Sequence, residues 1–273
     1  MQGRSDAKHA RVDVRRFGPW AVVTGASSGI GREAARQLAA NGFNLVLVAR
    51  REALLEETGR ALEQRYGIAF RVIAADLSTE EGQRSIVERS ADLDVGMLVA
   101  NAGIGQPGNF LAFEEADLRR VAQLNGVSYM YLAHAFGRRF AARGSGGMLL
   151  GSAFGADSGV PYNSKEAASK AMVSTLGRCL HHEFKPFGIH VSVLVVTPTE
   201  TPLIDKMGLR LAAMPMKPMP VEKCVTAGLK GVQANKLMVV PGLLYSLMVP
   251  LMPHGIARRM SAYMMRQSTE FVS

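Results

Sequence analysis

The sequence predicts an α/β protein with a mostly parallel β-sheet covered by helices on both faces. Two observations predict this class. Short apolar runs alternate with amphipathic helical stretches along the chain of 273 residues, and the runs are apolar at nearly every position instead of every second one. Parallel strands have apolar residues at nearly every position because the helices that connect them bury both faces of the sheet.

The order of the expected elements follows from this alternation. Runs rich in Val, Leu and Ile are interpreted as strands, and stretches with apolar residues three and four positions apart are interpreted as helices. Strands are expected at residues 20–24, 45–48, 70–74, 97–100, 148–150 and 189–196. Helices between them are expected at residues 30–40, 52–65, 116–139 and 167–184.

One domain is expected to contain nearly the whole chain, because no Pro/Gly/Ser-rich linker or internal repeat divides it. We assign residues 1–17 to a basic N-terminal tail and residues 18–273 to the domain. Ten of the fifteen methionines follow residue 200. Methionine adapts to irregular apolar surfaces, so we expect a substrate lid at about residues 200–222, with a packed surface segment as the alternative.

An apolar segment at residues 237–260 has about the length of a membrane span, but prolines interrupt it. We favour a packed C-terminal cap or an oligomer contact. Superficial membrane contact is the less favoured alternative, and the basic residues that would support it are Arg258, Arg259 and Arg266.

The composition narrows the possible partners and the location. The formal net charge of +9 is spread over the tail and the ends of helices, without the interleaved aromatics of a single-strand binder, so nucleic acid is not expected. The two cysteines, Cys179 and Cys224, provide neither a disulfide framework nor a metal-ligand cluster. The N-terminus has no apolar signal core. We therefore expect a cytoplasmic protein without a metal site.

A glycine-rich loop directly after the first expected strand predicts a dinucleotide site. The loop reads Thr24-Gly25-Ala26-Ser27-Ser28-Gly29-Ile30-Gly31 and leads into a helix. Its glycines permit a tight turn and close approach of the backbone to a pyrophosphate, and the helix presents free N–H groups and the positive end of its dipole. The strand before the loop and the helix after it are both present, which makes the motif specific.

The spacing TGxxxGIG resembles that of the short-chain dehydrogenase/reductase family. Further matches are Asp76-Leu77, Asn101-Ala102-Gly103 and Asn125, and together they cover about residues 20–203. The resemblance implies a Rossmann-type, doubly wound sheet of seven strands. It also implies a homodimer or homotetramer formed through the helices at residues 114–142 and 161–185. The cofactor contacts that it implies are Gly25, Ser27, Ser28, Ile30, Gly31, Asp76, Leu77, Asn101, Ala102, Gly103, Lys170, Thr199 and Thr201.

The residues at the end of the second expected strand indicate whether the site binds NAD or NADP. An acidic residue there would bind the ribose hydroxyls of NAD, whereas an arginine would pair with the 2′-phosphate of NADP. The chain has Arg50 and Arg51 at this point and no acid in reach. We therefore predict NADP(H).

The catalytic segment departs from the family. Relatives carry a serine, a tyrosine thirteen residues later and a lysine four residues after that. When Lys170 is aligned with the family lysine, the distance to Gly188 agrees without a gap, and Glu166 occupies the tyrosine position. Ala153 then occupies the serine position, with Ser152 one residue earlier and facing the other side of the strand. Taking Tyr162 as the catalytic tyrosine would require a deletion within a helix.

The nicotinamide end is also altered, because Val196 and Thr197 replace the family's Pro-Gly pair, while Thr199 and Thr201 still fit. The predicted catalytic residues are Glu166, Lys170 and Asn125. Glu166 would be the acid if burial raised its pKa, but we expect Lys170, one helical turn away, to hold it ionised, which would make it a poor proton donor.

Three functions are compatible with such a site. The first is an NADPH-dependent carbonyl reductase of a hydrophobic, polycyclic or polyketide-like substrate, with an altered proton path. The second is an isomerase, dehydratase or cyclase in which Glu166 is the general base. The third is a nucleotide-binding protein without catalytic activity. We favour the reductase.

Overall fold

A computed structural model describes residues 10–207 and 218–268, and its sheet confirms the predicted fold class. In this part of the chain the sheet has seven strands in the order β3-β2-β1-β4-β5-β6-β7, and all pairs are parallel. The connections are those of a doubly wound Rossmann-type fold, which reverses direction beside β1. The strands are β1 Trp20–Thr24, β2 Asn44–Ala49, β3 Phe70–Ala74, β4 Val95–Ala100, β5 Gly146–Ala153, β6 Ile189–Val196 and β7 Met238–Val239.

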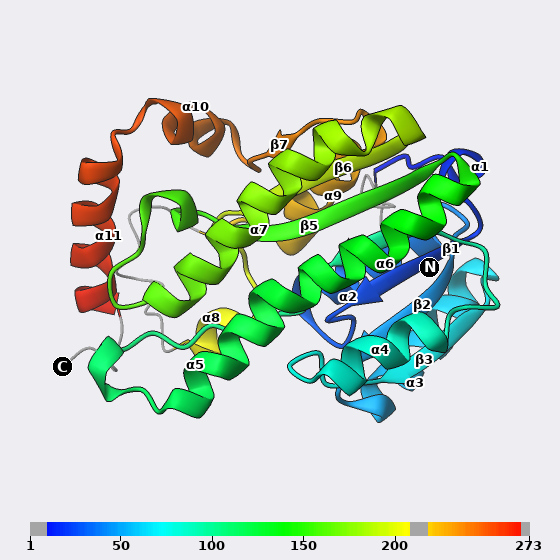
Figure 1. The fold of residues 1–273 in the computed structure, drawn as a ribbon, viewed down its shortest axis with the longest axis horizontal. Helices are drawn as coiled ribbons and strands as arrows, with labels where there is room; N and C mark the ends of the chain where they lie inside the picture. Colours follow the sequence, from blue (N-terminus) through cyan, green and yellow to red (C-terminus); the bar gives the residue numbers. More distant parts are fainter. Residues whose placement is uncertain (1–9, 208–217, 269–273) are drawn as a thin grey trace, which may run out of the picture.

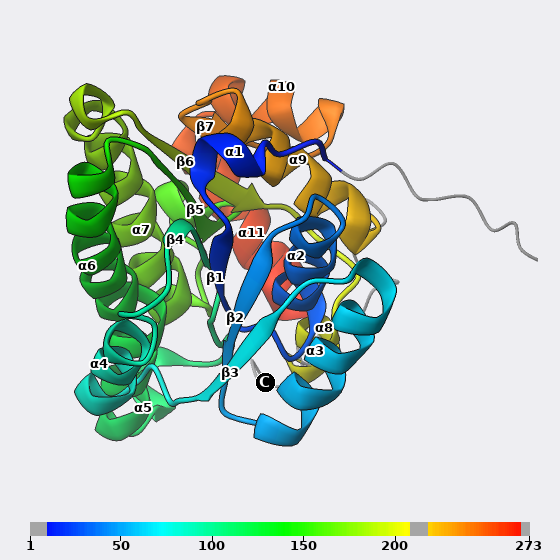
Figure 2. The same cartoon turned by 90° about the vertical axis from the view of Figure 1, so that its right-hand side faces the viewer.

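Helices cover both faces of the sheet (Figure 2). One face carries α2 Gly29–Ala39, α3 Glu52–Tyr66 and α9 Val221–Gln233, and the other carries α4 Glu80–Glu88, α5 Glu115–Ala122, α6 Ser128–Arg143 and α7 Ser164–Glu183. The strand β2 is apolar throughout because it contributes side chains to the core on each face of the sheet. Leu45 and Leu47 belong to the core beneath α2, whereas Val46 and Val48 belong to the core on the other face.

The long helix expected at residues 116–139 is interrupted by a π turn. This turn, η2 at Gln123–Val127, separates α5 from α6. Within it, the Asn125 amide donates to the carbonyl oxygen of Ile104 at 2.8 Å, and its Oδ1 accepts from the Ile104 N–H at 2.9 Å. The π turn thus holds the loop after β4, in agreement with the tendency of such turns to lie at functional sites.

The N-terminal segment is packed onto the domain from Ala10 onward, which differs from the expected tail over residues 1–17. The Ala10 carbonyl accepts from the Asn41 amide at 2.7 Å, and Asn41 Oδ1 accepts from the Val12 N–H at 2.9 Å. A short helix, α1 Val14–Phe17, then buries Phe17 completely. The apolar positions among the basic residues explain this packing. Residues 1–9 lie outside the described residues.

The C-terminal part forms two further helices at the end of the molecule where the strands terminate (Figure 1). The apolar segment expected at residues 237–260 contains β7, α10 Leu243–Leu251 and the first half of α11 His254–Ser268. Of the helices described, none is long and apolar enough to cross a membrane.

The expected lid at residues 200–222 begins with α8 Pro202–Lys206, and its Met214 and Met216 lie outside the described residues. Short 3₁₀ helices complete the fold at η1 Phe110–Ala112, η3 Ala156–Ser158 and η4 Lys185–Phe187.

Gly96→Ala tests the packing of the N-terminal segment against β4. A Cβ at Gly96 would lie 1.1 Å from the carbonyl oxygen of Phe17, so the two backbones cannot keep their positions. Overpacking of this kind lowers the free energy of unfolding, here by about 3 kcal/mol, as measured by chemical denaturation. Gly255→Ala in α11 is the matched control, because no other atom lies within 4 Å of its added Cβ. Equal stability of both variants would contradict this packing.

Candidate active site

A cavity of about 1200 Å³ lies at the edge of the sheet formed by the carboxyl ends of its strands. Ligands of open α/β sheets bind at this edge, beside the point where the strand order reverses. The loops after β1, β2, β3 and β4 line one half, and β5, β6 and the C-terminal helices line the other. All predicted cofactor residues line this cavity except Gly31.

Gly31 lies behind the wall, where it allows α2 to approach the glycine-rich loop. A Cβ at Gly31 would lie 2.3 Å from the carbonyl oxygen of Gly25, and Gly25 itself adopts a φ of 71°. A side chain at either position would distort the turn. The Ser28 side chain does not cap the first turn of α2, which leaves the helix N–H groups for an anion. This cradle fits a pyrophosphate.

Thr24, which was missing from the predicted site, fixes the two loops relative to each other. Its Oγ1 accepts from the N–H groups of Asn101 and Ala102 at 2.9 and 3.0 Å. The hydroxyl therefore ties the end of β1 to the loop after β4. Its position at the start of the glycine-rich loop is the feature of the sequence that could have identified it as a site residue.

The end of β2 carries positive charge and a hydroxyl group. Arg51 Nη2 donates to Ser27 Oγ at 3.2 Å, and Arg50 lines the same part of the cavity. Asp76 lies nearby, after β3. Burial alone would raise the pKa of Asp76, but hydrogen bonds from the Ser78 N–H and hydroxyl and the charge of Arg50 lower it below its usual value. An ionised Asp76 and two arginines therefore surround the part of the cavity that is predicted to bind the adenosine of the cofactor.

Lys170 is buried in the middle of the cavity wall. Its Nζ donates to the carbonyl oxygen of Gly151 and to the hydroxyl of Tyr129, both at 2.8 Å. The Tyr129 hydroxyl in turn donates to the Ala102 carbonyl at 2.9 Å. Burial lowers the pKa of Lys170 to about 8, although the charge of Glu166 opposes this shift. Tyr129 is buried in the core as expected, and its hydroxyl also holds the lysine.

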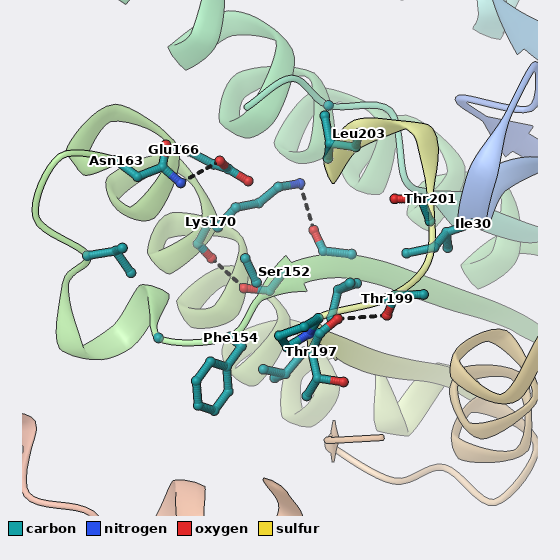
Figure 3. A pocket seen from close by; sticks show the side chains of 18 of the residues that line it. Ile30, Ser152, Phe154, Asn163, Glu166, Lys170, Thr197, Thr199, Thr201 and Leu203 are labelled. Carbon is teal, nitrogen blue, oxygen red and sulfur yellow. Dashed lines mark hydrogen bonds between the residues drawn. The ribbon is translucent and has the colours of Figure 1, made fainter. Parts of the chain in front are cut away.

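Glu166 also faces the cavity, one turn before Lys170 (Figure 3). Only 9% of its surface is exposed, and its Oε2 accepts from the Asn163 amide at 2.6 Å. Burial raises the pKa of Glu166 above its usual value, and it outweighs the opposing effects of Asn163 and of the Lys170 charge. The charge of Lys170 lowers the pKa of Glu166, as expected, but burial has the larger effect and raises it. Lys170 donates instead to Gly151 and Tyr129.

The space for the Glu166 carboxyl group is provided by Gly105 in the loop after β4. A Cβ at Gly105 would lie 2.7 Å from Glu166 Oε2 and 2.6 Å from Met207 Sδ. The Glu166 carboxyl group and the Met207 sulfur atom thus share the space that a side chain at residue 105 would occupy. The burial of the carboxyl group in this space accounts for the direction of its pKa shift.

Asn125, predicted as catalytic, is completely buried and is not among the residues that line the cavity. Both ends of its amide bind Ile104, as described above. The structure therefore gives Asn125 a positioning role for the loop that contains Gly103 and Gly105.

The alternative tyrosine does not line the cavity, and the hydroxyl of the alternative serine is bonded within the cavity wall. Tyr162 has a φ of 64°, its hydroxyl accepts from Arg266 Nε at 2.6 Å, and it is absent from the cavity lining. The Ser152 hydroxyl hydrogen-bonds with the Lys170 carbonyl and the Ser174 hydroxyl, both at 2.8 Å, in the core between β5 and α7 (Figure 3). Ser152 and Ala153 both line the cavity, but the Ser152 hydroxyl is engaged in these two hydrogen bonds.

The substrate half of the cavity is apolar, and most of its methionines come from an unexpected place. Met207 belongs to the expected lid and one methionine belongs to β7, whereas the others lie on α10, α11 and the turn between them. The segment expected to form a cap or oligomer contact, residues 237–260, contains all of these C-terminal methionines except Met264 and Met265. Thr199 and Thr201 close the side toward the glycine-rich loop, and Thr199 Oγ1 donates to the Thr197 carbonyl at 2.7 Å. The methionines are Met207, Met238, Met248, Met252, Met260, Met264 and Met265.

Curated proteins with similar sequences include reductases and dehydrogenases. A very-long-chain 3-oxoacyl-CoA reductase of Podospora anserina is 34% identical over 183 residues, which are 65% of this chain and 54% of the relative. A 7beta-hydroxysteroid dehydrogenase of Clostridium sardiniense is 28% identical, over 68% of this chain and 72% of the relative. The chain thus spans little more than half the length of the first of these relatives.

A family model and a solved structure agree with the fold and the glycine-rich loop. A short-chain dehydrogenase from Sphingobium yanoikuyae, solved in complex with NADPH, superposes with a TM-score of 0.78 at 31% identity, and the match covers 82% of this chain and 88% of that chain. The family model described as "short chain dehydrogenase" matches residues 19–210, which is more than half of the chain. The chain therefore belongs to the short-chain dehydrogenase family.

Proposed function

We propose that the protein is an NADPH-dependent reductase of a ketone on a bulky apolar substrate, with Glu166 as the proton donor. One observation carries this proposal. The groups that suit a phosphorylated dinucleotide and the groups that suit an apolar carbonyl compound line one continuous cavity, and the buried carboxyl group of Glu166 lies between them. A single cavity can hold both reactants in contact.

The cofactor half supports NADP(H) in particular. Arg50, Arg51 and the Ser27 hydroxyl provide donors for a 2′-phosphate, and the N-terminus of α2 fits the pyrophosphate. Lys170, a cofactor contact that the family resemblance implies, lines the same cavity. The bound cofactor would supply a hydride to the carbonyl carbon. The similar protein from Sphingobium yanoikuyae was solved with NADPH, which agrees with this assignment.

The protein's own residues provide the proton. As the carbonyl carbon gains the hydride, negative charge develops on its oxygen, and a protonated Glu166 donates its proton there, which gives the alcohol. Asn163 orients the carboxyl group through its amide. The Lys170 ammonium group stabilises the carboxylate that remains until it regains a proton from solvent.

The apolar half indicates the substrate class. Its methionine side chains adapt to a bulky ligand, and few charged groups lie near them. Two of the curated relatives are named for 3-oxoacyl-CoA and hydroxysteroid substrates, both of which carry large apolar parts. We therefore assign to this protein a ketone with a polycyclic or long-chain body.

A base role for Glu166 is the second candidate, and its raised pKa is the observation that favours it. In that case an isomerase or dehydratase would form product without oxidation of NADPH. Following NADPH absorbance and product together separates the two candidates. Product without consumption of NADPH would contradict the reductase.

The arginines at the end of β2 make a prediction for cofactor choice. Isothermal titration should show tighter binding of NADPH than of NADH. Replacement of both arginines, Arg50→Ala with Arg51→Ala, should weaken NADPH binding by about 10- to 100-fold, because charge-assisted hydrogen bonds to the phosphate are lost. NADH binding should change little, which is the internal control. Preferential binding of NADH by the unchanged protein would refute the assignment.

Glu166→Gln tests the proton donor, because glutamine keeps the shape and loses the acidic proton. The turnover number of carbonyl reduction should fall by about 10²- to 10⁴-fold. In the unchanged protein, reduction requires protonated Glu166, so turnover should decrease as pH rises through its pKa. Since burial raises the pKa of Glu166, this decrease should occur at higher pH than for an exposed glutamate.

The pH profile of Glu166→Gln supplies the control. The decrease assigned to Glu166 should be absent from it, whereas the change that arises from Lys170 should persist and move no higher in pH, because burial lowers the pKa of Lys170 and only the charge of Glu166 opposes this. Identical profiles for the two proteins would show that Glu166 does not supply the proton.

A further inference from the structure

The helix α10 is apolar on both its inner and its outer face. On the inner face, Tyr245 packs edge-to-face against Phe154 with ring centroids 5.2 Å apart, and Met248 lines the cavity. On the outer face, leucines recur at helical spacing and are exposed. The exposed fractions are 79% for Leu243, 54% for Leu244, 55% for Leu247 and 79% for Leu251. A contiguous apolar surface of this kind marks an interaction site.

The helix α11 extends this surface. Its Met260 and Met264 face the cavity, whereas Ile256 and Tyr263 are 58% and 67% exposed. We call the outward-facing set the C-terminal apolar surface. It comprises Leu243, Leu244, Leu247, Leu251, Ile256 and Tyr263.

The charged residues of α10 and α11 themselves are all basic. Between Lys223 and Ser268 the sequence contains no Asp or Glu. Arg258 and Arg259 are exposed in the first half of α11, beside Ile256, and Arg266 donates to Tyr162 near its end. Apolar side chains bordered by arginines, with a tyrosine among them, are typical of helices that lie in a membrane interface.

This charge decides between two occupants of the surface. In a symmetric dimer the same surface is present on both copies, and α10 and α11 contain no acidic residue that could pair with the arginines of the other copy. The anionic headgroups of a bilayer would instead attract them. We propose that the C-terminal apolar surface docks on an anionic lipid bilayer, with the leucines of α10 inserted among the headgroups.

The cavity opens at the same place. Leu251 is 79% exposed and also lines the cavity, together with Pro253 and His254 in the turn between α10 and α11. Docking would therefore bring the mouth of the cavity to the lipid. An apolar ligand dissolved in the bilayer enters through this mouth without crossing water, which is the part of the inference that rests on the proposed function.

Vesicle binding tests the docking without any substrate or turnover, so its outcome is independent of the proposed reductase activity. The purified full chain is mixed with vesicles of phosphatidylcholine alone or with added phosphatidylserine, and the bound fraction is measured by flotation. We expect binding to the vesicles that contain phosphatidylserine, weak binding to phosphatidylcholine alone, and loss of binding as salt concentration rises.

Two variants separate the apolar and the charged contributions. Leu247→Glu should weaken binding by about tenfold or more, because a leucine no longer enters the interface. The pair Arg258→Glu with Arg259→Glu should weaken it by about tenfold or more and abolish the preference for phosphatidylserine. Phe187→Glu is the matched control, since Phe187 is 50% exposed on η4 at the opposite end of α7. It should bind like the unchanged protein.

Thermal unfolding and NADPH titration establish that each variant is folded. The proposal is overturned if folded, unchanged protein fails to bind either vesicle type, or if Phe187→Glu and Leu247→Glu weaken binding equally. It is also overturned if light scattering shows a dimer that Leu247→Glu dissociates, because the surface would then be a contact between copies.

Discussion

The burial of the Lys170 ammonium group joins the parts of the site. Its hydrogen bonds to the Gly151 carbonyl and the Tyr129 hydroxyl connect α7 with β5 and α6, and Tyr129 continues the chain to Ala102 after β4. A buried cation is tolerated only when such partners satisfy it. One turn earlier, Glu166 shares this low-polarity surrounding without a direct ion pair to Lys170 in the described part of the chain. The hydrogen bonds of Lys170 therefore hold α7, β5 and α6 together around the site. Burial raises the pKa of Glu166.

Sequence reasoning was sufficient where local pattern determines structure. The apolar run Leu45–Val48 predicted a strand buried on both faces, and counting back from Gly188 placed Glu166 on the cavity wall. It was insufficient where contacts between segments far apart in the chain determine the structure. The pKa direction of Glu166 depends on the space above Gly105 and on Met207, and the π turn depends on the contact between Asn125 and Ile104. These contacts join residues far apart in the chain, so no local period encodes them.

The C-terminal helices combine two roles that their composition alone does not separate. Methionines point inward, where an adaptable wall suits a bulky ligand, and leucines point outward. A helix that is apolar all round is usually buried on all sides. Here one side forms the cavity and the other is exposed beside arginines, whereas the sequence favoured a packed cap or an oligomer contact over contact with a membrane. The proposed lipid contact and the proposed apolar substrate thus have a common structural origin in α10 and α11.

The central claim is that the carboxyl group of Glu166 carries a proton when the substrate binds. Infrared difference spectroscopy measures this directly, by comparing the NADPH-bound protein with its Glu166→Gln variant at neutral pH. The account predicts a carbonyl stretching band of a protonated carboxylic acid in the unchanged protein, absent from the variant and lost as pH rises. A carboxylate band assigned to Glu166 under the same conditions would contradict the account, because an ionised glutamate cannot donate the proton.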